Sequence, residues 1–291
     1  MLRVRHRTDY RYSARVALGP HRLMLRPREG IGCRLRSFDL SVDPPARIDW
    51  SEDVFGNAIA IAAFAGGSDV LAIESVAEVE LSSPEWPVFA IAASALSWPF
   101  RYADAEWADL GRLATPGYRD DDGRLARWAG GFVAARPTDT LSMLKDLCGG
   151  VSLYVSYQTR DAEGTQSPVD TLVRGWGSCR DYAVLFVEAA RILGFGARIV
   201  SGYIHDPDGA LAGSTGSGTT HAWAEVYLPG AGWIAFDPTN RSVGGYHLIP
   251  VTVARDIAAT VPVTGQFVGA GAQATMTVAV EVSEVPAPAA H

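Results

Sequence analysis

The chain has 291 residues, of which 48% are hydrophobic and 20% charged, a composition typical of folded globular proteins and not of disordered ones. This length is enough for one large domain or two of ordinary size, with a core that needs no disulfide or metal to hold it. The formal net charge of −7 argues against nucleic acid as the main partner, because neutralising phosphate groups requires an excess of Lys and Arg.

The chain contains three cysteines, Cys33, Cys148 and Cys179, which cannot all pair and whose spacing fits no zinc site. We expect Cys33 and Cys148 to be structural thiols, and we expect neither a metal nor another cofactor. The N-terminus has no apolar signal region, and no segment reaches the about 18–20 apolar residues needed to cross a bilayer. We therefore predict a cytoplasmic protein without membrane contact, in a compartment that keeps thiols reduced.

Residues 1–82 are predicted to form an antiparallel β sandwich or barrel-like N-terminal domain. Short segments rich in β-forming residues, several of them alternating between apolar and polar positions, are separated by Gly and Pro turns. The segment Gly56-Asn57 is interpreted as a tight hairpin turn and not as part of a site. The expected strands cover residues 2–12, 21–27, 34–42, 58–65 and 70–81.

Positive charge is concentrated at the N-terminal end, although the chain as a whole is acidic. Residues 1–36 hold ten Arg but only two acidic residues, Asp9 and Glu29. The simpler interpretation is a solvated strand surface, and the alternative is a docking face for an acidic protein partner. The sequence alone leaves both interpretations open.

The character of the chain changes after residue 82. Residues 83–105 are predicted to be a linker, because three prolines interrupt any regular pattern. A second domain is expected over residues 106–285, followed by a disordered tail over residues 286–291. Within it the pattern is helical over residues 105–148 and β-rich over residues 151–158.

The most informative segment is Gly177-Ser178-Cys179, where a glycine-rich loop leads into an apolar helical pattern over residues 180–193, followed by a strand over residues 197–204. A lone cysteine is usually a small buried hydrophobe, but neighbouring glycines are poor core residues and allow close approach to a ligand. A helix N-terminus stabilises a thiolate, and its N–H groups can also stabilise an oxyanion. Cys179 is therefore a candidate nucleophile.

Two candidate partners for Cys179 follow at the ends of predicted strands. His221 opens a strand over residues 221–228, and Asp237 closes the next strand over residues 232–237. Alone, His221 could be a core histidine and Asp237 a cap for the turn that follows it. Together with a thiol they have the composition of a Cys-His-Asp site, in which the carboxylate orients the imidazole and stabilises its charge.

Other positions in this region have two interpretations each. Trp176 and Trp223 either line an acyl-binding cleft or pack in the core. Asp181 either stabilises the helix N-terminus, which we favour, or contacts a substrate directly. The segment Asp206-Pro207-Asp208 is interpreted as a surface turn rather than a calcium loop, because two carboxylates without further spaced ligands are too few.

Four segments are distinctive in combination: Gly177-Ser178-Cys179-Arg180-Asp181-Tyr182-Ala183, Ala197-Arg198-Ile199-Val200-Ser201-Gly202-Tyr203, His221-Ala222-Trp223-Ala224-Glu225-Val226-Tyr227 and Gly232-Trp233-Ile234-Ala235-Phe236-Asp237-Pro238-Thr239-Asn240. Together they resemble the transglutaminase-like superfamily, in particular its bacterial cysteine-protease type. The N-terminal β region, His247 and residues 253–257 also resemble parts of bacterial members, so the resemblance spans most of the chain. It implies an α+β fold with a papain-like core, in which a Cys at a helix N-terminus meets a His and an Asp on adjacent antiparallel strands.

The resemblance also implies roles for individual residues: Cys179 as nucleophile, His221 as general base and acid, and Asp237 as the orienting carboxylate. The usual bacterial motif reads more like Gly-Val-Cys-Gln-Asp-Phe-Ala, and here Ser178 and Arg180 replace Val and Gln. Arg180 adds a cation beside the thiol, which favours a thiolate or recruits an acidic group. Arg180 is therefore a candidate substrate contact, together with Trp176 and Trp223.

The reaction implied is attack of a thiolate on a peptide or glutamine-type amide of a peptide or protein substrate, through a thioester. Water would resolve the thioester in a protease or amidase, and an amine would resolve it in a transglutaminase. The three side chains serve both reactions, and we favour hydrolysis because water is the more abundant acceptor. The alternative from another class is a noncatalytic binding or scaffold module that retains the fold.

Overall fold

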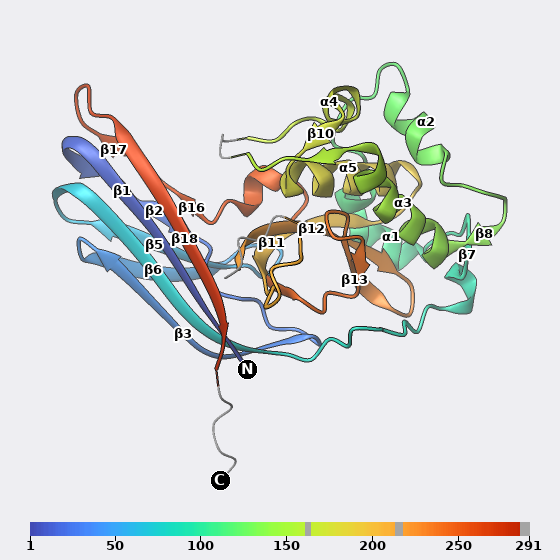
Figure 1. Cartoon of the computed structure of the whole chain (residues 1–291), viewed down its shortest axis with the longest axis horizontal. Helices are drawn as coiled ribbons and strands as arrows, with labels where there is room; N and C mark the ends of the chain where they lie inside the picture. Colours follow the sequence, from blue (N-terminus) through green and yellow to red (C-terminus); the bar gives the residue numbers. More distant parts are fainter. Residues whose placement is uncertain (161–163, 213–217, 286–291) are drawn as a thin grey trace, which may run out of the picture.

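The computed structural model describes residues 1–160, 164–212 and 218–285. The fold belongs to the α+β class and consists mainly of strands, as predicted. Figure 1 shows a central sheet that lies between the long N-terminal strands on one side and the helices on the other. Both faces of this central sheet are therefore covered, and the strands that carry His221 and Asp237 belong to it.

Two antiparallel sheets make up the N-terminal part and enclose a shared apolar core. Along the first strand, buried Leu2 and Val4 alternate with exposed Arg3 and Arg5. This period-two pattern gives the strand one face for the core and one for solvent, which is the basis of the predicted β architecture. The strands are β1 (Leu2–Leu18), β2 (His21–Leu23), β3 (Cys33–Asp43), β4 (Ala46–Glu52), β5 (Ala58–Phe64) and β6 (Gly67–Leu81).

Arg3, Arg5 and Arg7 of β1 pair with acidic residues on the neighbouring strand β6. Arg3 Nη2 lies 2.7 Å from Glu78 Oε1, and Arg5 Nη2 lies 2.8 Å from Glu74 Oε2. Arg7 Nη1 also contacts Glu74 Oε2, at 3.1 Å. Such cross-strand pairs are what a solvated strand surface needs, because opposite charges offset one another across the ladder. A docking face for an acidic partner stays a prediction, and that partner would have to compete with these carboxylates.

The last strands of the chain return to the N-terminal sheets. β18 (Ala274–Glu284) pairs along β1, from Leu2 opposite Glu284 to Tyr12 opposite Ala274. β17 (Phe267–Val268) also pairs with β1, and β16 (Val263–Thr264) pairs with β2. This pairing satisfies the second edge of β1, which would otherwise expose unpaired N–H and C=O groups. The final strands of the predicted second domain, residues 106–285, therefore lie in the sheets of residues 1–82.

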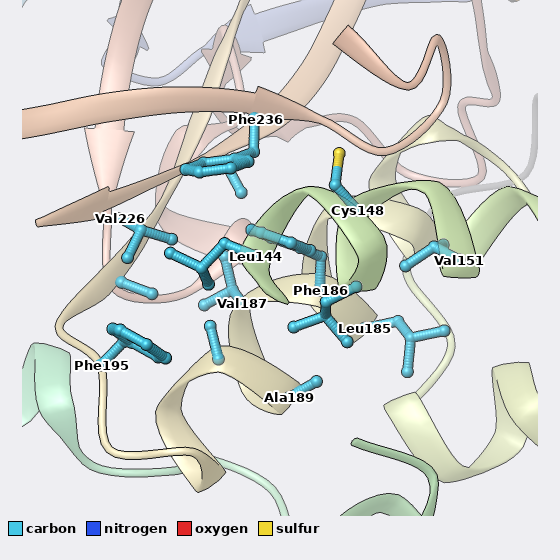
Figure 2. Close-up of a cluster of buried hydrophobic side chains, with 14 of the residues drawn as sticks. Leu144, Cys148, Val151, Leu185, Phe186, Val187, Ala189, Phe195, Val226 and Phe236 are labelled. Carbon is cyan, nitrogen blue, oxygen red and sulfur yellow. The ribbon is translucent and has the colours of Figure 1, made fainter. Parts of the chain in front are cut away.

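The central sheet has the strand order β14-β13-β12-β11-β15, and helix α5 (Cys179–Ile192) packs against it. Every residue of α5 from Asp181 to Arg191 is buried, as expected of a helix with apolar residues on all sides. Figure 2 shows its side chains meeting Phe236 and Val226 of the sheet and Leu144 of α3. The strands are β11 (Ala197–Ile204), β12 (Thr219–Leu228), β13 (Gly232–Asp237), β14 (Ser242–Val243) and β15 (Leu248–Ala254).

The β-rich pattern expected over residues 151–158 is strand only at Ser156–Tyr157, because α3 continues to Tyr154. Val151 extends the buried side of α3 at helical spacing from Leu144 and Cys148, so tertiary packing overrides its β preference. The helices are α1 (Asp104–Leu110), α2 (Arg124–Gly130), α3 (Thr140–Tyr154), α4 (Pro168–Arg174) and α5 (Cys179–Ile192), with short 3-10 turns at Ala93–Ala95, Gly111–Ala114 and Ile257–Thr260. Two-residue strands are β7 (Ser97–Trp98), β8 (Thr138–Asp139), β9 (Ser156–Tyr157) and β10 (Trp176–Gly177).

The segment predicted as a linker, residues 83–105, is attached to the second part of the chain. Its strand β7 pairs with β8, and the indole Nε1 of Trp98 donates to Leu193 O at 2.8 Å. Ala92 N donates to Pro229 O at 2.8 Å. These contacts hold the segment against α5 and the β12–β13 turn, so it does not act as a free tether.

The turn between β4 and β5 fastens the N-terminal sheets to the central sheet. Asn57 is fully buried there, and its side-chain amide bonds both backbone groups of Val253 in β15. Asn57 Nδ2 donates to Val253 O at 2.8 Å, and Asn57 Oδ1 accepts from Val253 N at 2.9 Å. Arg28 Nη1 also donates to Asn57 Oδ1 at 2.7 Å, and Asn57 Nδ2 donates to Asp53 Oδ2 at 2.7 Å. The turn predicted at Gly56-Asn57 is confirmed, and its side chain has a structural role.

We expect Asn57→Ala to lower the free energy of unfolding by about 2–4 kcal/mol, because it leaves the N–H and C=O of Val253 buried without partners. Chemical denaturation measures this change. Val54→Ala, in the same turn but 95% exposed, is the matched control and should cost no more than about 0.5 kcal/mol. Equal stabilities for the two variants would contradict the assigned role of Asn57.

Candidate active site

Cys179 is the first residue of α5, and glycines bring the chain to it. α4 ends at Gly175, whose φ of 68° lies in the left-handed region that favours glycine. At Gly177 a Cβ atom would lie 2.9 Å from the Cβ of Asp181, so this close approach of the chain requires glycine. Cys179 is half-buried at the N-terminus of this helix, whereas residues 181–191 of the helix are buried.

Asp181 holds the N-terminus of α5 in place. Its Oδ2 accepts from Ser178 N at 2.8 Å and from Ser178 Oγ at 2.9 Å. Its Oδ1 accepts from Gln166 N at 2.7 Å and from Arg160 Nη2 at 3.0 Å. The carboxylate is fully buried and occupied by these donors, so the structural interpretation of Asp181 is favoured over direct contact with a substrate.

His221 and Asp237 lie on adjacent antiparallel strands, β12 and β13, as predicted. His221 Nε2 lies 2.8 Å from Asp237 Oδ2, and the two side chains are 0% and 1% exposed. Asp237 Oδ1 accepts from Thr239 N at 2.9 Å, and Asp237 Oδ2 also accepts from Asn240 Nδ2 at 2.8 Å. A buried carboxylate with this many donors stays ionised and fixes the orientation of the imidazole.

The second ring nitrogen of His221, Nδ1, has no hydrogen-bond partner among the described residues. The Cys179 thiol interacts with the His221 side chain and with the N–H of Ala222. Cys179 is thus linked to His221 by its electrostatics, and His221 is linked to Asp237 by a hydrogen bond.

The electrostatics of these three residues favour a charged pair. Burial alone would raise the pKa of Cys179, but interactions with His221, with Ala222 N–H and with the Arg180 cation outweigh it and lower that pKa. Burial would lower the pKa of His221, but Asp237 and Cys179 raise it to about 10. The pKa of Asp237 is lowered, because His221 and the donors around it outweigh its burial. A thiolate beside an imidazolium is the state that these shifts favour.

Trp223 belongs to the core. It is 1% exposed and packs in an apolar cluster with Val200 and Val253. Its ring lies 6.1 Å from the His221 ring at an interplanar angle of 22°. A Cβ atom at Gly202 would come within 2.9 Å of this indole, so glycine makes room for it. Of the two interpretations of Trp223, packing behind His221 fits its burial better than lining an open cleft.

Trp176 and Arg180, the other expected substrate contacts, are half-buried near Cys179. Arg174 stacks over the Trp176 ring, with its Cζ 5.9 Å from the centroid. Arg180 Nη2 donates to Arg160 O at 2.9 Å, and its positive charge contributes to the lowered pKa of Cys179. Their contact with a substrate stays a prediction.

Two polar side chains at this site escaped the sequence analysis. Tyr157 of β9 is half-buried, and burial together with the charges of Cys179 and Asp237 raises its pKa to about 12. Asn240 bonds Asp237 through its side-chain amide. The only local signal for Asn240 was its place in the turn after Asp237, and Tyr157 lay in a segment interpreted by its β propensity alone.

The remaining predicted features have simple structural settings. Cys33 and Cys148 are buried, and burial raises the pKa of both thiols, that of Cys33 to about 12. Asp206 accepts from the N–H groups of Ala210 and Leu211, as expected of a turn. Over residues 1–160, 164–212 and 218–285, no group of three or more His, Cys, Asp or Glu side chains is arranged to hold a metal ion.

A cavity of about 400 Å³ lies in the N-terminal part, and none of Cys179, His221 and Asp237 lines it. Its lining residues are Arg26, Pro27, Arg28, Glu29, Trp50, Ser51, Glu52, Gly56 and Ala58.

None of the helices in the described part of the chain combines the length and apolar character needed to cross a membrane.

Two family models match separate parts of the chain. A model of the bacterial transglutaminase-like N-terminal region matches residues 2–80, and a model of the transglutaminase-like superfamily matches residues 126–238. Uncharacterised proteins of Mycobacterium bovis and Mycobacterium tuberculosis are 29% identical over 302 residues, covering 99% of this chain and 94% of theirs.

A solved structure has the same fold. It is that of a candidate cysteine protease from Cytophaga hutchinsonii, with a TM-score of 0.70 and 18% identity, covering 99% of this chain and 92% of that one. At this identity the likeness concerns the fold alone. The two family models and the α+β architecture around Cys179 lead to one conclusion. The chain belongs to the transglutaminase-like superfamily and includes the N-terminal region of its bacterial members.

Proposed function

We propose that this protein is a cysteine-nucleophile acyl-transfer enzyme that acts on peptide or glutamine-type amides of a peptide or protein substrate. The main support is the buried His221–Asp237 pair beside a half-buried Cys179 whose pKa is lowered. A noncatalytic module would have no need of a charged pair in this position, because taking charges out of water costs free energy. Family membership supports a cysteine-based enzyme in general.

In the first half of the reaction, the Cys179 thiolate attacks the carbonyl carbon of the amide. A C–S bond forms, and the electron pair of the C=O bond moves to oxygen, where N–H groups at the start of α5 can stabilise the negative charge. When the intermediate collapses, the C–N bond breaks. The His221 imidazolium gives its proton to the departing nitrogen, which leaves as an amine or as ammonia.

In the second half, neutral His221 accepts a proton from the acceptor while the acceptor attacks the thioester. The C–S bond then breaks, and the thiolate–imidazolium pair is restored. Asp237 holds the same ring orientation throughout, because its carboxylate is bonded to His221 Nε2 at 2.8 Å.

Water as the acceptor gives hydrolysis, and a primary amine gives transamidation. We favour hydrolysis, because water is the more abundant acceptor unless a site excludes it. Reducing surroundings protect a thiolate nucleophile from oxidation, so a cytoplasmic location remains part of the proposal.

The pH dependence of alkylation tests the charged pair. Thiolate is present above the lowered pKa of Cys179, and imidazolium persists until the pH passes the His221 pKa of about 10. We expect iodoacetamide to alkylate Cys179 at pH 7 about 10²-fold faster than Cys33 or Cys148, measured by peptide mapping. His221→Ala should slow Cys179 and move the midpoint of its profile to higher pH.

Thr220→Ala is the matched control, because Thr220 is the exposed neighbour of His221 on the same strand. Its alkylation profile should equal that of the unaltered protein. If Cys179 reacts no faster than Cys33 and Cys148 between pH 5 and 8, the activated thiolate is refuted.

Incubation with a peptide library, with and without a primary amine, tests the reaction itself. Mass spectrometry distinguishes cleavage, deamidation and amine incorporation in one sample. We expect cleavage or deamidation that is lost in Cys179→Ala and reduced by about 10³-fold or more in His221→Ala, because the residues of such a site act as a unit.

Cys33→Ala, which changes a thiol in the N-terminal sheets, should retain activity. Full activity in Cys179→Ala would exclude the covalent mechanism. Binding of peptides without any turnover, by a protein whose Cys179 also fails to alkylate, would instead support a scaffold module.

A further inference from the structure

Asn240 joins two parts of the molecule that the reaction scheme above treats separately. Its side-chain Nδ2 donates to Asp237 Oδ2 at 2.8 Å, and its Oδ1 accepts from Ala212 N at 2.9 Å. Ala212 lies in the connection between β11 and β12, the strand that carries His221. Both ends of one amide are thus occupied, one by the carboxylate and one by this connection.

At the Asp237 end, two side-chain donors meet at the same oxygen. Oδ2 accepts from His221 Nε2 and from Asn240 Nδ2, each at 2.8 Å, while Oδ1 accepts from Thr239 N at 2.9 Å. The terminal torsion of an Asp side chain is broad, so backbone donors at one oxygen leave some freedom to the other. The second donor on Oδ2 removes that freedom and keeps the oxygen opposite the imidazole.

At the other end, residues 205–212 include a turn and also contact the apolar cluster that contains Trp223. Asp206 accepts from Ala210 N and from Leu211 N, each at 3.1 Å, which closes a turn. Leu211 packs on the cluster that contains Trp223, and Trp223 stacks on the His221 ring. A displacement of this segment would therefore disturb the packing behind His221 through Leu211. It would also disturb the position of Asp237 through Asn240.

We propose that Asn240 is a positioning residue that couples the placement of residues 205–212 to the alignment of Asp237 with His221. The inference deepens the proposed acyl transfer and rests on it, since the benefit of alignment is faster reaction at Cys179. Asn240 touches no reacting atom; it acts through Asp237. A simple turn-forming role would predict a loss of stability without any change in the titration of the site.

Two substitutions separate the two ends of the amide. Asn240→Asp keeps an oxygen for Ala212 N but replaces the donor to Asp237 with a second acceptor. Asn240→Ala removes both contacts. Ser242→Ala, an exposed position shortly after in the chain, is the matched control. Thermal melting establishes that each variant is folded, and Asn240→Asp serves alone for the titration if Asn240→Ala does not fold.

The first readout is the pH profile of Cys179 alkylation by iodoacetamide, together with kcat and KM for a cleaved peptide. We expect both Asn240 variants to lower kcat about 10- to 100-fold with a smaller effect on KM, the usual range when a residue that orients an active group is lost. Their alkylation profiles should shift from that of the unaltered protein. Unchanged profiles and kcat in Asn240→Asp would overturn the positioning role.

The second readout is hydrogen exchange over residues 205–212. The amide of Ala212 should exchange faster in Asn240→Ala than in Asn240→Asp, which retains an acceptor for it. Equal protection of Ala212 in the two variants would overturn the coupling to this segment. The exchange measurement needs no activity, so it tests Asn240 even if no amide is cleaved, while slow alkylation of Cys179 in the unaltered protein would refute the proposed function itself.

Discussion

The pairing of the His221 imidazole with the Asp237 carboxylate, out of contact with water, is the constraint on which the rest of the site depends. Two buried charges are tolerated only when each keeps hydrogen-bond partners. The carboxylate has them in Thr239 N and in the Asn240 amide, and the Cys179 thiol interacts electrostatically with the imidazole. Gly177 and the buried Asp181 carboxylate fix the start of α5, and with it the position of Cys179.

The central sheet gives these groups a rigid base because both of its faces are packed. Phe186 of α5 stacks on Phe236 of β13, with centroids 5.3 Å apart, immediately before Asp237 in the chain. On strand β11, Tyr203 belongs to the cluster shared with the N-terminal sheets, and its hydroxyl lies 3.0 Å from His6 Nδ1. The N-terminal region is therefore part of the support of the site and not an appendage to it.

Features with a local signature could be predicted from the sequence. The strand over residues 197–204 has the predicted bounds, and α5 begins and ends one residue before its predicted range. The three proposed catalytic residues follow from their motifs in the same way. β4 was missed because most of its residues are exposed, and the pairing of β18 with β1 joins opposite ends of the chain, for which no local pattern exists. Asn240 was missed because its partner Ala212 becomes a neighbour only on folding.

Since the first and last strands are neighbours, everything between β6 and β16 is topologically an insertion into the N-terminal sheets. The inserted part is held by two covalent connections, one leaving after Leu81 and one returning before Val263. Two connections leave the inserted part less freedom to move relative to the N-terminal sheets than the single link between two domains in series would. The site is therefore held to these sheets by both connections, in addition to the contacts of Asn57 and Tyr203.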